Sequence, residues 1–137
     1  MKKIFLSLFV ALLAAGATAQ TIDRSAVQQA TDEMAALYQL DEDQKAKMYK
    51  IQERHFKNMA SIESLTDTDQ NLYVQKRRAV RMGTDASTKR LLTEAQMPIF
   101  NEQQLERRKK ESALIRKMKA EGASKEEIQL AILEMEQ

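Results

Sequence analysis

The sequence predicts an all-α protein built from long amphipathic helices. Beyond residue 19 the chain has one proline, Pro98, and two glycines, Gly83 and Gly122, so residues that interrupt helices are scarce. Apolar side chains recur at spacings of three and four residues along several segments, which is the period of one helix face. Short polar motifs typical of helix starts precede several of these segments. We therefore expect helices to form nearly all of the regular structure.

Residues 1–19 are predicted to be a cleaved secretory signal. Lys2 and Lys3 precede an apolar run over residues 4–15, and residues 17–19 supply the small side chains of a cleavage site. The alternative, a retained membrane anchor, needs a longer apolar run of about 20 residues. We expect a periplasmic protein with no stable membrane insertion after cleavage, and secretion remains an alternative. Because the chain has no cysteine, its stability must come from packing or self-association.

The first two helices are predicted at residues 25–38 and 41–64. The apolar stripe of the first comprises Val27, Ala30, Met34 and Leu37. The apolar arc of the second covers nearly half of its circumference and comprises Met48, Tyr49, Ile51, His55, Phe56, Met59, Ala60 and Ile62. An arc that wide can pack on a neighbouring helix and leave apolar surface for a second subunit or a bound client.

The third helix is expected to begin at Thr66 or Asp67 and to continue through Gly83 to Leu91. Its alternative is a break near residue 82, because glycine weakens a helix interior.

The fourth helix is predicted from Thr93 to about Glu121, closed by Gly122. Its ends are apolar, but residues 101–113 offer little to bury. We therefore expect a thin, elongated arrangement with exposed helix middles.

Residues 123–137 are predicted to form a separate, acidic amphipathic helix that begins at a box of Ser124 and Glu127. It follows a helical domain at residues 20–122. The sequence leaves open whether this helix docks on the rest of the chain, binds a partner or frays.

The charges are unevenly distributed along the chain. Residues 76–119 contain 13 basic and 5 acidic residues, a net charge of +8. This segment, called here the basic belt, favours acidic partners, although much of it is also explained as solvated helix surface. In an exported protein we expect no nucleic-acid partner.

Two similar motifs precede the second and fourth helices. "LDEDQ" provides Leu40, Asp41 and Gln44, and "LTEAQ" provides Leu92, Thr93 and Gln96. Asp or Thr followed three residues later by Gln can satisfy two unpaired backbone N–H groups of a helix start, as a capping box. Both motifs are therefore predicted to begin helices.

This pair of motifs, in an exported chain without cysteine, resembles the LTXXQ-motif family of periplasmic proteins, which includes the Spy and CpxP proteins. The resemblance covers roughly residues 30–118, although family members often carry proline directly after the Thr, whereas here proline follows only at Pro98. It implies long helices paired as hairpins in a thin, cradle-like homodimer with a basic, partly apolar concave face. It also implies a chaperone that works without ATP, or a regulatory partner of an envelope-stress sensor kinase. The motif positions Leu40, Asp41, Gln44, Leu92, Thr93 and Gln96 are implied to be structural.

The candidate client-binding surface combines cations that attract clients with apolar side chains that hold them. Its predicted residues are Arg77, Arg78, Arg81, Arg107, Arg108, Lys109, Lys110, Met48, Phe56, Met59 and Ile62. The expected partners are unfolded client proteins or one envelope sensor protein.

Other classes of function have little support in the sequence. Some relatives suggest metal binding, but His55 is the only histidine and there is no cysteine, so we expect no metal site and no cofactor. A packed or interfacial role suits His55 better. No catalytic motif occurs, and we expect no enzyme.

Overall fold

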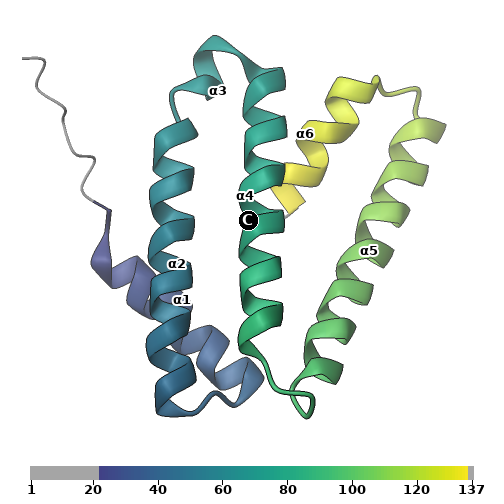
Figure 1. Cartoon of the computed structure of the whole chain (residues 1–137). Coiled ribbons are helices and arrows are strands. Elements are labelled where there is room, and N and C mark those ends of the chain that lie inside the picture. The colour runs from purple at the N-terminus through teal and green to yellow at the C-terminus, as the bar shows by residue number, and fades with distance from the viewer. Residues whose placement is uncertain (1–21, 136–137) are drawn as a thin grey trace, which may run out of the picture.

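The computed structural model describes residues 22–135, which form α-helices joined by short turns (Figure 1). The helices are α1 (Arg24–Tyr38), α2 (Glu42–Ile62), α3 (Leu65–Thr68), α4 (Gln70–Leu91), α5 (Met97–Ala120) and α6 (Lys125–Met135). No strand occurs within the described range, which confirms the all-α prediction. The predicted signal at residues 1–19 and the last two residues of the predicted tail lie outside the described residues.

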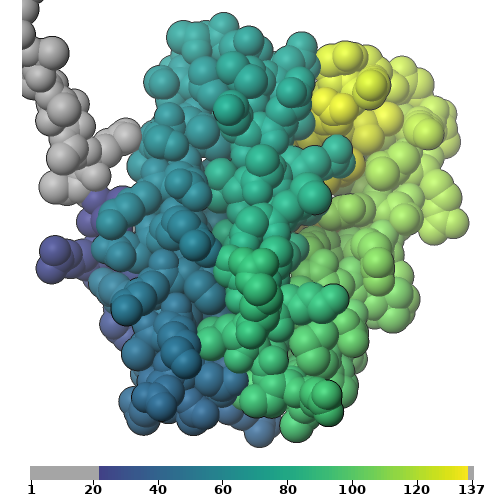
Figure 2. Space-filling view, in the orientation of Figure 1, coloured from purple at the N-terminus to yellow at the C-terminus, as the bar shows by residue number. Residues whose placement is uncertain are grey.

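The helices α2 and α4 pack as a hairpin connected by α3 (Figure 1). α1 crosses α2, while α5 leaves the base of α4 and splays away from it. α6 then folds back from the far end of α5 toward the middle of α4. In Figure 2, α2, α4 and α5 lie side by side on the face toward the viewer. Between residues 22 and 135, none of the helices has the length and apolar character needed to cross a membrane.

The start of α4 differs from the prediction. Asp69 caps this helix, because its carboxylate accepts a hydrogen bond of 2.9 Å from the backbone N–H of Leu72. The Thr66 hydroxyl instead donates to the carbonyl of Glu63 at 2.7 Å. Neither Thr66 nor Asp67 begins the long helix, since both lie in the separate short turn α3. The predicted continuation through Gly83 is confirmed, because α4 runs unbroken to Leu91.

The predicted start of the fourth helix at Thr93 is wrong, because α5 begins at Met97. The Gln96 side-chain oxygen accepts from the Thr93 N–H at 2.9 Å, which is half of a capping box. The Thr93 hydroxyl donates to that same oxygen at 3.1 Å rather than accepting from the backbone. Residues 93–96 consequently form a turn. Pro98 follows in the first turn of α5, where its missing N–H leaves no helix bond unmade.

The acidic tail docks as a helix. The Ser124 N–H donates to the Glu127 carboxylate at 2.7 Å, and the Glu127 N–H donates to the Ser124 hydroxyl at 3.2 Å, which confirms the predicted capping box. Ile128 and Leu133 of α6 are buried. The sequence left open whether this helix docks on the rest of the chain, binds a partner or frays. In the structure it docks against α4 and α5.

The main core lies at the base of the molecule, where the turn between α1 and α2 meets the turn between α4 and α5. Its buried members are Tyr38, Met48, Leu92 and Phe100. The middle of α5 contributes little to burial, and Leu105 there is 46% exposed. This confirms the predicted exposed helix middle.

Candidate functional site

The two repeated motifs meet in space. The side-chain amide of Gln44 donates to the Gln96 oxygen at 2.8 Å, and the Gln96 amide donates back to the Gln44 oxygen at 3.0 Å. Gln44 also donates to the carbonyl of Leu91, and Gln96 to that of Gln39. Each side chain thereby ties its own helix start to the end of another helix. These contacts give Gln44 and Gln96 a structural role.

The first motif is also a complete capping box. The Asp41 carboxylate accepts from the Gln44 N–H at 2.8 Å, while the Gln44 oxygen accepts from the Asp41 N–H at 3.2 Å. Next to it, Leu92 is buried in the core and Leu40 packs against that core. The end of the molecule that contains both motifs and the main core is called here the motif end. It fixes the bases of α2, α4 and α5, and α5 diverges from α4 beyond it (Figure 1).

A cleft of about 480 Å³ opens above the motif end, bordered by α1, α2, α4, α5 and the end of α6. Its apolar lining consists of Met34, Leu37, Tyr38, Met59, Phe100 and Met135. Its cationic lining consists of Arg77, Arg81, Arg107 and Lys110, and its acidic lining of Asp85 and Glu106. The same cavity therefore offers flexible apolar contact and several charged groups.

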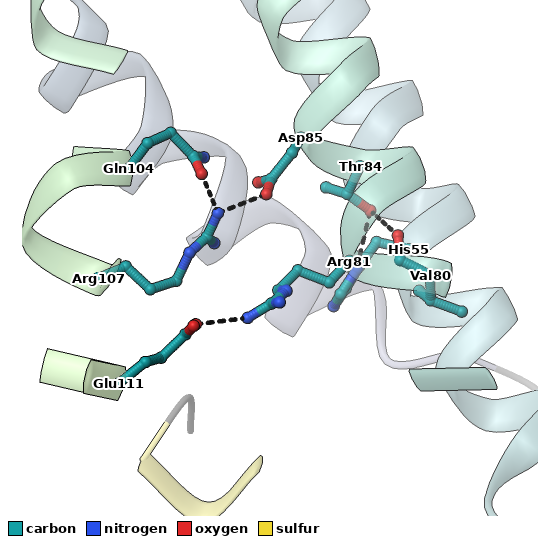
Figure 3. A network of polar contacts seen from close by, with 8 residues as sticks. All are labelled: His55, Val80, Arg81, Thr84, Asp85, Gln104, Arg107 and Glu111. Atoms are coloured by element: carbon teal, nitrogen blue, oxygen red, sulfur yellow. Dashed lines mark hydrogen bonds and ion pairs between the residues drawn. The ribbon is translucent and has the colours of Figure 1, made fainter. Parts of the chain in front are cut away.

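Two ion pairs cross the cleft between α4 and α5 in opposite senses (Figure 3). Arg81 of α4 pairs with Glu111 of α5 at 3.0 Å. Arg107 of α5 pairs with Asp85 of α4 and also donates to Gln104. The four side chains of these ion pairs are each between 22% and 30% exposed to solvent. Because α4 and α5 make little direct packing contact, they are linked across the cleft by these pairs and by α6, which packs against both helices.

His55 lines the cleft, and its surroundings favour the neutral form of the ring. Burial lowers its pKa, the charge of Arg77 lowers it further, and Asp85 opposes this shift. Its Nδ1 lies 3.1 Å from the hydroxyl oxygen of Thr84, which donates its own proton to the Val80 carbonyl (Figure 3). We therefore assign the ring proton to Nδ1.

The structure brings together five of the predicted client-binding residues in the cleft. These are Met59, Arg77, Arg81, Arg107 and Lys110. Arg78, Arg108 and Lys109 are exposed outside it, and half-buried Phe56 packs edge-on against His55 with ring centres 5.8 Å apart.

Two predicted binding residues need correction. Met48 has 0% exposure and belongs to the core, and Ile62 is also buried, at the end of α2. Met48 therefore offers no accessible surface. Ile62 is only 7% exposed and lies at a separate cavity between α2, α3 and α4, outside the cleft.

Several lining residues were not predicted as binding residues. Met34 and Leu37 were identified only as the stripe of the first helix, and Phe100 only as part of the apolar start of the fourth. Their apolar spacing was a usable signal, because a stripe must face some partner. Asp85 carried no such signal, because its partner Arg107 lies on a different helix. Gln104 lies three residues before Arg107 on α5, a spacing at which helical side chains meet.

Searches of the known protein families, of characterised proteins and of solved structures found no match to this chain. Within residues 22–135 there is no group of three or more His, Cys, Asp or Glu side chains placed to hold a metal ion.

Proposed function

We propose that this chain is an ATP-independent chaperone of the periplasm that holds unfolded or aggregation-prone envelope proteins. The observation that supports this most strongly is the cleft, which combines an apolar lining with cationic side chains. The resemblance of the two motifs to the LTXXQ-motif family points to the same function, and the secretion signal predicted at residues 1–19 suits the location.

The apolar lining suits clients of varied sequence. Met34, Met59 and Met135 contribute three unbranched, polarizable side chains to one cavity. Methionine adapts its shape to different partners, so a surface rich in it can repack around many segments. Such contacts are reversible, which a holding chaperone requires.

Five of the seven predicted client-binding cations fall into two sets with different roles. Arg81 and Arg107 are already engaged across the cleft. Arg78, Arg108 and Lys110 are exposed and form no ion pair with any residue between 22 and 135. We assign to this second set the attraction of acidic client segments over long range, which raises association rates at low salt.

We further propose a homodimer. Met82 on α4 is 61% exposed and Leu105 on α5 is 46% exposed, so apolar surface remains outside the core. Light scattering coupled to gel filtration measures the mass directly, and a monomer at every concentration would remove the dimer from the proposal.

The first test of the holding function is the aggregation of a denatured client diluted into buffer without nucleotide. We expect near-stoichiometric protein to suppress light scattering, and added salt to weaken that suppression. If scattering is unchanged at every ratio, the proposed function is wrong. In that case, one dominant partner in pull-downs from cell envelopes would favour the alternative, a regulator of an envelope sensor protein.

Matched charge variants test whether these three residues attract clients specifically or whether any loss of positive charge has the same effect. The test variant changes Arg78, Arg108 and Lys110 to Ser, and the control changes Lys47, Lys50 and Lys119 to Ser. All six residues are exposed, and both variants lose three positive charges. We expect the capture rate at low salt to fall on the order of tenfold in the test variant only. Equal rates in both variants would exclude the steering role of these three residues.

A further inference from the structure

The acidic helix α6 occupies part of the surface that the proposed function assigns to clients. It lies against α4 and α5 (Figure 1). Its final residues reach the cleft, where Met135 contributes to the lining. On α4 it lies beside the segment that carries Arg77, Arg78 and Arg81, and Arg78 stays exposed there. The protein therefore carries a segment of its own chain at the mouth of its cleft.

The contacts of α6 combine apolar burial with an electrostatic anchor. Leu133 is buried, and its backbone carbonyl accepts a hydrogen bond of 3.1 Å from the Arg77 guanidinium. Carbonyls in the last turn of a helix are unpaired and carry partial negative charge, so a cation there is favourable. α6 has no basic residue in its own last turn, and Arg77 of α4 supplies the cation.

The fit of α6 on α4 is close. The residual cavity between them, lined by Val74, Arg78 and Arg81 on one side and Gln129, Ile132 and Leu133 on the other, is about 20 Å³. That volume holds about one water molecule. α6 is therefore seated on this surface and excludes other chains from it.

Few buried side chains hold α6 in place. α6 has 11 residues, and only Ile128 and Leu133 among them are buried. A helix of this length is marginal in water without tertiary packing. A turn at residues 121–124, with Gly122 at a φ of +80°, connects it to α5 and keeps it nearby after release.

We propose that α6 is a displaceable internal competitor for the cleft, and that a client must push its end away from Arg77 to bind fully. This inference rests on the proposed holding function. α6 offers Arg77 a backbone carbonyl and offers the cleft the apolar side chain of Met135, which are groups that an unfolded client segment also offers. Only molecules in which α6 is displaced bind a client fully. The observed client affinity is therefore the intrinsic affinity multiplied by the fraction of molecules that are open.

The test compares two full-length variants. Ile128→Ser with Leu133→Ser removes the buried anchors of α6, whereas Lys125→Ser with Glu126→Ser changes two exposed residues of the same helix. Neither variant changes the net charge. Hydrogen exchange should show loss of amide protection at residues 128–135 in the first variant only, and circular dichroism should show that the rest of the helical structure is retained.

The binding probe is reduced, carboxymethylated α-lactalbumin, which stays unfolded in buffer and is acidic. By fluorescence anisotropy we expect the anchor variant to bind it about three- to tenfold more tightly than the parent, with the exposed-residue variant unchanged. Equal or weaker binding by the anchor variant, beside a parent that binds, would overturn the inference and leave the proposed function intact. If no variant binds the probe and the parent also fails to prevent aggregation, the proposed function fails and this inference fails with it.

A second measurement uses the parent protein and does not depend on the folding of a variant. A synthetic peptide of residues 123–137 is added at millimolar concentration, comparable to the effective concentration of a tethered segment. We expect it to weaken probe binding at least twofold, with a scrambled peptide of the same composition having no effect. If the two peptides act alike, α6 does not compete for the client site.

Discussion

The motif end and the cleft are built from the same long helices but are held together by different forces. At the motif end, Met48 and Phe100 lie in a buried core, and Gln44 and Gln96 exchange hydrogen bonds. Across the cleft, α4 and α5 make little direct contact and are linked by partly exposed ion pairs, such as that of Arg81 with Glu111, and by the docked helix α6. A close-packed core fixes a single geometry, whereas ion pairs that keep part of their solvation contribute less to stability and are weakened by salt. One end therefore sets the fold, and the other remains adjustable.

The largest effect is expected in the core of the motif end. Met48 is fully buried, so Met48→Ala removes apolar contacts and leaves a cavity. We expect a loss of about 2–5 kcal/mol in the free energy of unfolding, measured by urea titration with circular dichroism.

The control for this prediction is Met82→Ala, the same substitution at a side chain that is 61% exposed, with both variants measured at a protein concentration low enough for light scattering to give the monomer mass. Its effect should remain within about 0.5 kcal/mol. Similar losses at both positions would show that the two regions do not differ in packing.

The next largest effect is expected at the pair of motif glutamines. Gln44→Ala removes the side-chain amide that donates to the Leu91 carbonyl and to the Gln96 side chain. Because these partners are left unsatisfied, the change should cost about 1–3 kcal/mol of unfolding free energy. A double-mutant cycle with Gln96→Ala should give a coupling energy of about 0.5–3 kcal/mol. Additive losses would mean that the two motifs do not stabilise each other.

A smaller effect on stability is expected across the cleft. Arg81→Gln breaks the pair with Glu111, and because both side chains are partly solvated the loss should be about 0.2–1 kcal/mol. Spin labels at Ala86→Cys on α4 and Ser112→Cys on α5 report the distance between these helices. The distribution of that distance should broaden in the Arg81→Gln variant, and it should also broaden in the parent at high salt. A distribution insensitive to both changes would show that the cleft is as rigid as the motif end.

The smallest effect is expected from the titration of His55. Its pKa in the folded protein lies below the unfolded value, so the unfolded chain binds more protons between these two values. The contribution of His55 to stability is therefore fully present above the unfolded pKa, roughly 6.5, and is lost as pH falls through the folded pKa. Urea titrations across this range should show the loss in the parent and a flatter profile in His55→Gln. Identical profiles would place the pH dependence elsewhere.

Local sequence patterns predicted most of the fold. The helical period identified the long helices, and the box at Ser124 gave the start of α6. The same capping rule failed at Thr93, because the Gln96 side chain is shared with Gln44 across the molecule and the chain turns before α5 begins. It also failed at Thr66, where a short turn precedes the true cap at Asp69.

The candidate site was predicted less completely, because it depends on how helices register against one another. Basic residues were visible as a belt along the chain, but the pairing of Arg107 with Asp85 joins two helices and has no local signature. An apolar period likewise cannot tell which side chains enter a core. Met48 and Met59 lie on the same predicted arc, yet the first is buried in the core and the second lines the cleft.

The most direct test of the account is to locate a bound client on the surface. The chain has no cysteine, so a single photoreactive label can be attached at Gln103→Cys, which lines the cleft, or at Gln75→Cys, an exposed position on α4 outside it. With unfolded α-lactalbumin, the account predicts strong cross-linking from position 103 and little from position 75. Equal cross-linking from both positions, or stronger cross-linking from position 75, would contradict the assignment of the cleft as the client-binding site.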